Sequence, residues 1–257
     1  MLILLPPSEG KSAPTRGKPL DLDRLGHPSL TTTRRTVLDA LASASERADA
    51  ADLLGIGHTQ LDLLERNRTL ATAPTARADR IYTGVLYDAL DLGALSPGGR
   101  RRAGHRVAIT SALFGLVRPG DRIPAYRLSG DATLPGLGPV AGAWRVVLGE
   151  AVRAALGTGL LMDLRSTTYA AFWRAPADLA RRTATVRVLH EADGTRSVVS
   201  HFNKATKGRI VRSLLEDGGD PRTPAALARL LADLGWHVET GPATAQGTRL
   251  DVVVSQV

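Results

Sequence analysis

The sequence predicts an α/β protein built on one mixed β-sheet with helices around it. Single helical patterns alternate with short apolar runs along the chain, which is typical of strands joined by helices. Late in the chain, two runs rich in β-branched residues flank an Asp-Gly turn, and this pattern indicates an antiparallel hairpin. The hairpin favours a mixed sheet over a purely parallel one.

Length and composition limit the class of protein. At 257 residues and 43% hydrophobic content the chain can bury a sizeable core, and we expect one domain over residues 1–257. The opening MLILLPPSEGK has only five apolar residues before two prolines, so we expect neither a signal peptide nor a membrane anchor. We expect a cytoplasmic monomer. The absence of cysteine excludes disulfides and thiolate metal sites.

The first third of the chain should hold one buried strand and several helices. Met1–Leu5 is an apolar run that two prolines end, because proline cannot continue a central ladder. Ser8–Gly26 is rich in glycine and proline and predicts a loop. Apolar residues at helical spacing predict a helix over Thr31–Arg47 and a pair of helices around Gly55-Ile56-Gly57, with a linker over Arg68–Arg80.

The middle third should alternate helices with strands. Ile81–Leu92 is amphipathic and predicts a helix. Gly98–Arg102 is rich in glycine and arginine and predicts an exposed basic turn, with a buried strand after it over Arg106–Thr110. The spacing predicts a helix over Val140–Leu156 and a strand over Leu160–Leu164.

The last third should contain the hairpin and a covering of helices. Asp193-Gly194 tolerates positive φ, so Thr185–His190 and Arg196–His201 should be antiparallel neighbours. Periodicity predicts the other elements, which are helices over Thr167–Trp173, Lys204–Leu215 and Pro224–Leu234 and strands over Trp236–Glu239 and Arg249–Val254.

The positive charge suggests an anionic partner. Lysine and arginine outnumber aspartate and glutamate by 33 to 25, which gives a formal charge of +8. Neutralisation of phosphates by such side chains drives non-specific binding to nucleic acids. A bias of composition toward arginine and alanine explains the charge equally well, so charge alone does not decide between nucleic acid and a solvated surface.

The densest motif runs over Leu113–Leu128, where an apolar strand end enters a proline-stiffened loop. It carries Arg118, Asp121, Tyr126 and Arg127. A planar guanidinium makes paired hydrogen bonds to phosphate or carboxylate, and Asp121 could hold such an arginine in one orientation. An Arg–Asp pair that only braces the turn is the alternative.

A second cationic stretch, residues 200–212, leads from a strand end into a helix and carries Lys204 and Lys207. Helix amino termini favour anions, and the lysines would strengthen that preference. A solvated basic helix face explains the same pattern. His201 is a candidate for proton transfer, although a lone histidine is more often half-buried with its hydrogen bonds satisfied.

Polar residues also lie just beyond the first strand, where α/β proteins commonly bind ligands. Ser8, Glu9 and Lys11 stand there, so Glu9 could act as a base and Lys11 could hold an anion. A polar surface loop is the alternative.

A similar group follows the strand over Leu160–Leu164. Arg165, Ser166 and Tyr169 are candidates for the same site. Helix capping is an ordinary role for Ser166, and a buried tyrosine with a satisfied hydroxyl is an ordinary role for Tyr169.

Residues from about 48 to 68 resemble a helix-hairpin-helix element. Gly55-Ile56-Gly57 stands between two helical segments, with Arg66 and Arg68 nearby. The resemblance implies that backbone amides at Gly55 and Gly57 contact a DNA phosphate. A plain pair of helices joined by a glycine turn is the alternative.

Five blocks, in this order, resemble an actinobacterial-type member of the YaaA family of peroxide-stress-response proteins: MLILLPPSEGK, IYTGVLYDAL, LFGLVRPGDRIPAYRL, DLRSTTY and SHFNKATKGRIVRSLL. The resemblance spans nearly the whole chain. It implies an unusual single-domain α/β fold, a positively charged cleft, DNA binding and protection of DNA against peroxide and iron. The cleft residues that match the family pattern are Lys11, Arg118, Asp121, Tyr126, Arg127, Ser166, Tyr169, Lys204, Lys207 and Gly208.

Two functions follow as hypotheses. The first is a DNA-binding protein of the oxidative-stress response, which contacts phosphates through Ser8, Lys11, Gly55, Gly57, Arg118, Asp121, Arg127, Arg165, Ser166, Lys204, Lys207 and Gly208. The second is an enzyme acting on a small phosphorylated or nucleotide-like compound in the same cleft, where Glu9, Tyr126, Tyr169 and His201 move protons. Neither requires a cofactor, and the six scattered histidines argue against a dedicated iron site.

Overall fold

The computed structural model describes residues 1–192, 194–198 and 200–255, without the side chains at positions 200 and 201. The strands are β1 (Leu2–Leu5), β2 (Ala76–Arg77), β3 (Val107–Ser111), β4 (Gly115–Val117), β5 (Arg122–Ile123), β6 (Thr133–Leu134), β7 (Gly138–Pro139), β8 (Leu161–Asp163), β9 (Thr183–Ala192), β10 (Thr195–Ser197), β11 (His237–Thr244) and β12 (Gly247–Val254). The α-helices are α1 (Thr31–Ser45), α2 (Ala50–Leu53), α3 (Asp62–Arg68), α4 (Ala78–Ile81), α5 (Val85–Leu90), α6 (Pro97–Arg106), α7 (Val140–Leu156), α8 (Thr167–Ala170), α9 (Ser200–Asp217) and α10 (Pro224–Asp233). Short 3₁₀ turns cover Leu22–Arg24, Pro28–Leu30, His58–Gln60, Leu92–Ala94 and Ala177–Arg182.

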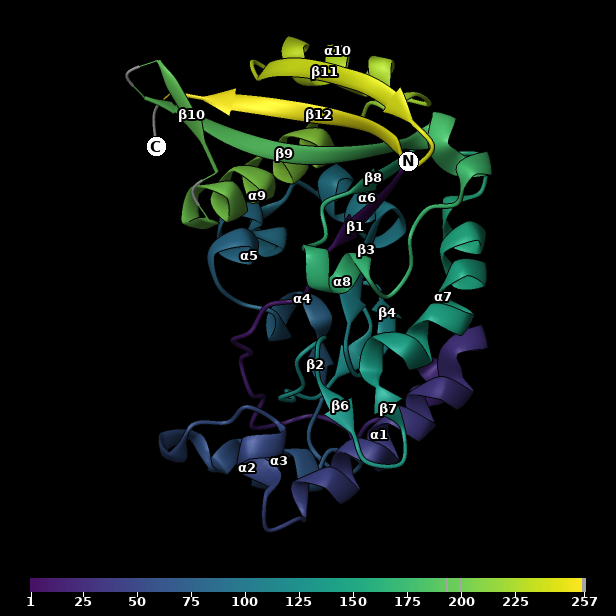
Figure 1. Cartoon of the computed structure of the whole chain (residues 1–257), viewed down its shortest axis with the longest axis vertical. Coiled ribbons are helices and arrows are strands. Elements are labelled where there is room, and N and C mark those ends of the chain that lie inside the picture. Colours follow the sequence, from purple (N-terminus) through teal and green to yellow (C-terminus); the bar gives the residue numbers. More distant parts are fainter. Residues whose placement is uncertain (193, 199, 256–257) are drawn as a thin grey trace.

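Eight strands form one mixed sheet in the order β11-β12-β9-β8-β1-β3-β4, with β10 paired to β9 (Figure 1). The run from β12 to β3 is parallel, whereas β4, β10 and β11 pair antiparallel to their neighbours. The predicted mixed α/β fold is therefore confirmed. Two small sheets, β2 with β5 and β6 with β7, lie outside it.

The first strand occupies the middle of this sheet. Ile3 lies opposite Val107 of β3 on one side and Met162 of β8 on the other. All four residues of β1 are buried, as expected of an apolar strand in a parallel sheet that is covered on both faces. Helices α5 and α9 lie on one side of the molecule and α7 on the other (Figure 1).

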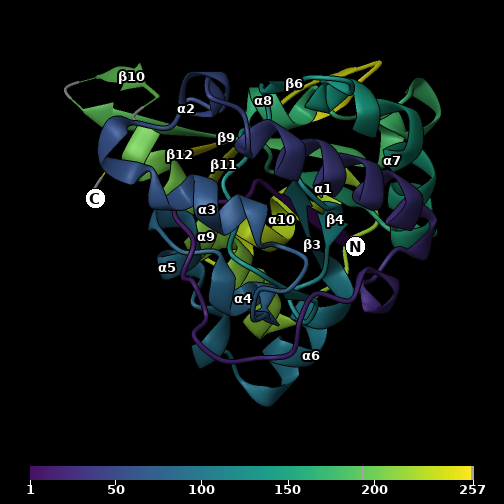
Figure 2. The ribbon, with the colours of Figure 1, turned by 90° about the horizontal axis from the view of Figure 1, so that it is seen from below.

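The helices from the first third of the chain gather beyond the lower end of the central strands. Figure 2 shows α1 and α3 side by side at this end, and the two helices contact each other. The chain from the end of β1 passes down to this region before α1 begins (Figure 1). Residues that follow β1 therefore lie between the sheet and α3.

Most elements predicted from periodicity are confirmed within a few residues. Besides residues 98–102, three segments differ from the prediction. The predicted helix after Thr167 is the four-residue α8, and the predicted linker over Arg68–Arg80 contains β2 and α4. The third is the hairpin, where β9 and β10 pair as expected but Ser200 and His201 begin α9. Strand β10 has only three residues, all of them exposed at the edge of the sheet. Little apolar burial is therefore available to stabilise a longer strand. Residue 193 of the hairpin turn lies outside the described residues.

The prediction of an exposed basic turn over Gly98–Arg102 was wrong, because this segment forms helix α6. Ser96 caps the helix by accepting a hydrogen bond from the Gly99 N–H at 3.0 Å, and Pro97 occupies the first helical position. Arg102 donates to the Leu215 and Glu216 carbonyl oxygens at 2.6 and 2.8 Å. Arg102 thus satisfies carbonyls at the end of α9, whereas Arg100 and Arg101 are exposed.

Helix α9 packs closely on α5 at Gly208. A Cβ at this position would lie 2.3 Å from the Leu86 carbonyl oxygen and 2.9 Å from the Ala89 Cβ. The two backbones can approach this closely only because residue 208 has no side chain.

Gly208→Ala should therefore lower the free energy of unfolding by about 1–3 kcal/mol through overpacking. Gly104→Ala in α6 is the matched control, because a Cβ there meets nothing within 4 Å. The control should gain up to about 1 kcal/mol from helix propensity. Urea unfolding measures both variants, and equal stability would contradict the close packing of α9 on α5.

Candidate functional site

Three parallel strands end at one edge of the sheet and carry the candidate residues just beyond their ends. The segments after β1, β3 and β8 begin at Pro6, Ala112 and Leu164. The chain passes from β1 to β3 on one side and later returns to β8 on the other side of β1. Such a change of direction leaves a crevice at the carboxyl ends of the strands, where α/β proteins bind ligands.

Lys11 lies in this crevice. It forms an isolated antiparallel bridge with Tyr82, and its Nζ donates to the Ser8 carbonyl oxygen at 2.9 Å. The Nζ lies 4.3 Å from the centroid of the Tyr126 ring, in a cation–π geometry. Burial lowers the pKa of Lys11 to about 8; the Glu9 carboxylate opposes this shift and the Arg127 guanidinium adds to it. The amine therefore titrates near neutral pH.

All four tyrosines of the chain, Tyr82, Tyr87, Tyr126 and Tyr169, are buried around this crevice. The Tyr126 hydroxyl lies 3.1 Å from the Tyr82 hydroxyl and 2.7 Å from the Ser111 Oγ, so the three groups form a chain of hydrogen bonds. Burial raises the pKa of each tyrosine, to about 12 for Tyr82. The hydroxyls stay protonated at neutral pH and remain hydrogen-bond donors.

Arg127 is positioned by α3. The Asn67 side chain exchanges two hydrogen bonds with the Arg127 backbone, at 2.8 and 2.9 Å. The Arg127 guanidinium pairs with the Glu9 carboxylate, whose side chain is 68% exposed. The Arg127 Nε is buried and has no hydrogen-bond partner among the described residues. One N–H of this cation is therefore buried without a hydrogen bond among the described residues.

A hollow of about 420 Å³, called here the Lys11 hollow, is lined by Glu9, Gly10, Lys11, Gln60, Leu63, Arg66, Tyr126 and Arg127. Its walls come from the loop after β1, from α3 with the turn before it, and from the segment before β6. A second hollow of about 420 Å³ lies on the other side of Arg127 and reaches Gly55. Arg127 therefore stands between the crevice and the glycine-containing turn.

The glycine turn ends α2 in a Schellman motif. The Ile56 N–H donates to the Ala51 carbonyl oxygen at 2.8 Å, the Gly55 N–H donates to Asp52, and Gly55 has a φ of 59°. Helix α2 is only four residues long. Gly57 has ordinary extended angles, and a Cβ there would meet nothing within 4 Å.

The loop with Arg118 and Asp121 lies apart from the Lys11 hollow. The Asp121 carboxylate accepts hydrogen bonds from the Gly26 N–H at 3.0 Å and from the Arg118 N–H at 2.8 Å. It braces the turn through backbone groups, while Arg118 is exposed.

Arg165 fixes the segment that holds Tyr169. It forms an ion pair with Asp163 at 2.7 Å and donates to the Tyr169 and Trp173 carbonyl oxygens at 3.1 and 2.8 Å. Its guanidinium is buried by these contacts. Ser166 occupies the N-cap position of α8, as expected, but its side chain makes no capping hydrogen bond.

The candidates on α9 differ in environment. Lys207 donates to the Leu164 carbonyl oxygen at 3.4 Å, and burial lowers its pKa while Asp163 opposes the shift. Lys204 is exposed, and Gly208 contributes the close contact with α5. The side chain of His201 lies outside the described residues. The Ser8 Oγ donates to the Gly10 carbonyl oxygen within its own loop and accepts from the Thr83 N–H at 3.1 Å, which links that loop to the segment before α5.

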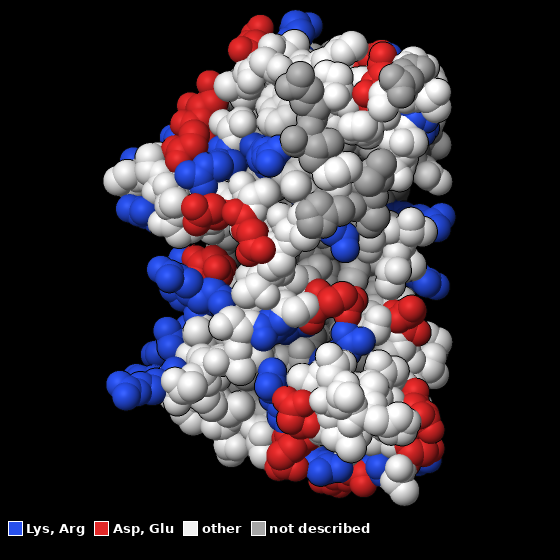
Figure 3. All heavy atoms as spheres, turned by 90° about the vertical axis from the view of Figure 1, so that its left-hand side faces the viewer, with Lys and Arg blue, Asp and Glu red and all other residues white. Residues whose placement is uncertain are grey.

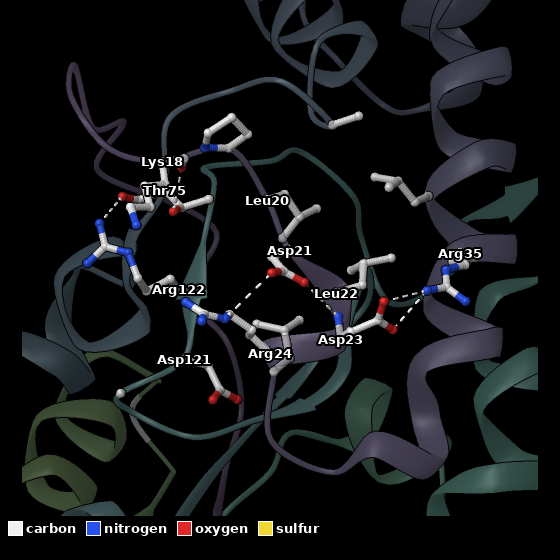
Figure 4. Close-up of a pocket in the computed structure, with 15 residues that line it drawn as sticks. Lys18, Leu20, Asp21, Leu22, Asp23, Arg24, Arg35, Thr75, Asp121 and Arg122 are labelled. Atoms are coloured by element: carbon white, nitrogen blue, oxygen red, sulfur yellow. Dashed lines mark hydrogen bonds and ion pairs between the residues drawn. The ribbon is translucent and has the colours of Figure 1, made fainter.

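A larger hollow, of about 760 Å³, lies elsewhere, between the loop over residues 18–25 and α1 (Figure 4). Two ion pairs join residues of its own wall, Asp21 with Arg24 and Asp23 with Arg35. Arg122 donates to the Thr75 carbonyl oxygen at 2.7 Å, and the exposed Lys18 also lines this hollow. No residue of α3 or of the Gly-Ile-Gly turn lines it, so it is separate from the candidate site.

Sequence reasoning did not identify several residues of the crevice, namely Tyr82, Tyr87, Ser111 and Gln60. Tyr82 and Tyr87 follow the first strand by more than 70 residues, and contacts such as the bridge to Lys11 and the bond from Tyr87 to the Pro6 carbonyl oxygen bring them there. The chain has only four tyrosines, and their presence in motifs near strand ends was the signal that could have identified Tyr82 and Tyr87. No cluster of three or more metal-binding side chains occurs among the described residues, and none of the helices described is long and apolar enough to span a membrane.

The Lys11 amine should titrate with a midpoint near pH 8 in the folded protein. The chain has four lysines, so ¹³C labelling of lysine allows the Cε shifts to be followed by NMR against pH. In concentrated urea the same signal should move to about 10.4, the value of an unperturbed lysine. A folded midpoint above about 10 would show that burial does not control this amine.

Comparison with known proteins agrees with the sequence motifs. The model of the family described as peroxide stress protein YaaA matches residues 1–240. A UPF0246 protein of Streptomyces coelicolor is 50% identical over the whole of both chains. A UPF0246 protein of Corynebacterium efficiens is 41% identical over 93% of this chain and 95% of its own. This chain belongs to the YaaA family of peroxide stress proteins.

Proposed function

We propose that this peroxide stress protein binds DNA in the cytoplasm without sequence preference, and that the Lys11 hollow receives a backbone phosphate. The observation that carries the proposal is the composition of the hollow. Lys11 and Arg127 line it from the crevice, and Gln60 and Arg66 line it from the segment that follows the Gly-Ile-Gly turn. Cleft and turn can therefore contact the same ligand.

The cations of the hollow are suited to a phosphodiester. Arg127 is held in place through its backbone by Asn67, and its only carboxylate partner among the described residues, Glu9, is exposed. A phosphate can take the place of Glu9 and gain the planar, paired hydrogen bonds that a guanidinium offers. Lys11, while protonated, adds a second charge in a site of low dielectric.

The turn beside the hollow allows close approach by a DNA strand. Gly57 has no side chain and no neighbour within 4 Å of a Cβ position, so its backbone N–H can reach a phosphate. The single-turn α2 and the Schellman motif at Gly55 orient this backbone. This arrangement supports a helix-hairpin-helix-like role for residues 48–68.

The surface charge argues for few phosphate contacts. Lysine and arginine are interspersed with aspartate and glutamate on the face in Figure 3. Many exposed arginines pair with carboxylates, as Arg47 does with Asp49 and Arg153 with Asp178. We therefore assign the binding to the three cations of the hollow, and not to the net charge of the chain.

Binding to a 20-base-pair duplex should depend on salt with a log–log slope of about −3, one unit for each of three cations. Arg66→Gln should weaken binding about 3- to 10-fold at low salt and reduce the slope by about one, because it removes one phosphate contact. Fluorescence anisotropy over a range of salt concentrations measures both quantities.

Arg24→Gln is the matched control, because it also removes one arginine that pairs with a nearby aspartate. It should leave affinity and slope unchanged, since Arg24 lies on the larger hollow and not on the Lys11 hollow. Equal losses in the two variants would assign binding to net charge, and no binding at low salt would refute the DNA proposal.

An enzyme acting on a small phosphorylated compound is the second candidate. The buried tyrosines and the low pKa of Lys11 favour it, because perturbed titratable groups in a concave site are typical of catalysis. Glu9, Tyr126 and Tyr169 would move protons. Displacement of the duplex by micromolar adenosine monophosphate would support this candidate, since the hollow has room for a nucleotide-sized ligand but not for a duplex.

A further inference from the structure

Lys11 differs from the other cations of the hollow in its hydrogen-bond partners. Its Nζ donates to the main-chain oxygens of Ser8 and Glu9, at 2.9 and 3.4 Å, and no described carboxylate forms an ion pair with it. A lysine held by neutral acceptors in a half-buried site can lose its proton and become a nucleophile. Neither arginine of the hollow can do this, because guanidinium stays charged.

We propose that the Lys11 amine forms an imine with an aldehyde on a phosphate-bearing ligand in the Lys11 hollow. The inference rests on the proposed binding of phosphate in the same hollow. Arg66 and Arg127 remain charged and hold the phosphate, while the ligand's aldehyde reaches Lys11. These different roles follow from the chemistry of the side chains. Two arginines that stay charged and one amine that can lose its proton line a single cavity.

Before a phosphate binds, the local environment supplies neutral amine at physiological pH. With a pKa of about 8, roughly one quarter of Lys11 is unprotonated at pH 7.5, against roughly one in a thousand for an unperturbed lysine. Burial is the main cause of the low pKa of Lys11, and the positive charge of Arg127 lowers it further. Both causes are present in the protein whatever the ligand is.

The reaction balances without an oxidant or a reductant. The nitrogen lone pair of Lys11 attacks the carbonyl carbon, a C–N bond forms, and a proton moves from nitrogen to the former carbonyl oxygen. The C–O bond then breaks and the hydroxyl leaves as water together with the second nitrogen proton, which leaves the imine; addition of water reverses the reaction. Glu9 lies at the exposed mouth of the hollow and can exchange the protons with solvent.

An aldehyde and a phosphate occur together in an abasic site of DNA and in small sugar phosphates. The abasic site is the source that fits the proposed DNA partner, because the phosphates on either side of the lesion would place its aldehyde beside Lys11. The experiment below includes both sources.

The test traps the imine with sodium cyanoborohydride, which reduces it to a stable amine. The full chain is incubated with a labelled duplex that contains one aldehydic abasic site or, in a second arm, with ribose 5-phosphate. Denaturing gels and peptide mass spectrometry locate the adduct. The variants are Lys11→Arg, which keeps a cation but removes the nucleophile, and Lys18→Arg as the control at an exposed lysine.

The proposal predicts an adduct at Lys11 in at least one arm, reduced more than about 20-fold by Lys11→Arg and unchanged by Lys18→Arg, with a yield that rises between pH 6.5 and 8. Adducts spread over the amino terminus and the other lysines in both arms would overturn it.

Binding of a duplex with a tetrahydrofuran abasic analogue, which has no aldehyde, is measured in parallel. If that duplex binds and nothing is trapped, the imine is refuted and DNA binding stands. If it does not bind and ribose 5-phosphate is trapped at Lys11, the imine stands and DNA binding is refuted.

Discussion

The site depends on the parallel pairing of β1 with β3 on one side and β8 on the other. This pairing brings the carboxyl ends of three strands to one edge, so the loop with Lys11, the Ser111 hydroxyl and the segment with Tyr169 meet there. Each of these strands is short and buried, and burial of apolar side chains stabilises the arrangement at about 25 cal/mol per Å². A slip in the register of β1 would move its loop away from the tyrosines.

Polar groups at this edge are tolerated because they satisfy one another. The Tyr82, Tyr126 and Ser111 hydroxyls share hydrogen bonds, and Ser111 also accepts from the Phe114 N–H. Lys11 uses backbone carbonyl oxygens and the face of an aromatic ring, which stabilise an ammonium less than water does when the site is desolvated. The low pKa of Lys11 is the consequence of this exchange.

The sheet and the main helices could be predicted from the sequence, because the periodicity of apolar residues reflects which side chains are buried. Four residues of the crevice could also be predicted, because each lies in a motif at the end of a strand: Lys11, Tyr126, Arg127 and Tyr169. The sequence could not separate Arg118 and Asp121 from these residues, since adjacency in sequence does not show which backbone groups a carboxylate holds. Nor could it show the contacts of Arg102 in α6 or of Gly208. Their partners lie on other helices, and only the packed structure shows that Arg102 binds the end of α9 and that Gly208 touches α5.

The central claim is that the Lys11 hollow is where a phosphate-bearing ligand binds. Addition of a short DNA oligonucleotide, and separately of inorganic phosphate, to protein labelled with ¹³C-lysine tests this most directly by NMR. The account predicts that the Cε signal of Lys11 shifts first and that its titration midpoint rises, because a bound phosphate favours the ammonium form. Shifts at the exposed Lys18 or Lys204 with an unchanged Lys11 would contradict it.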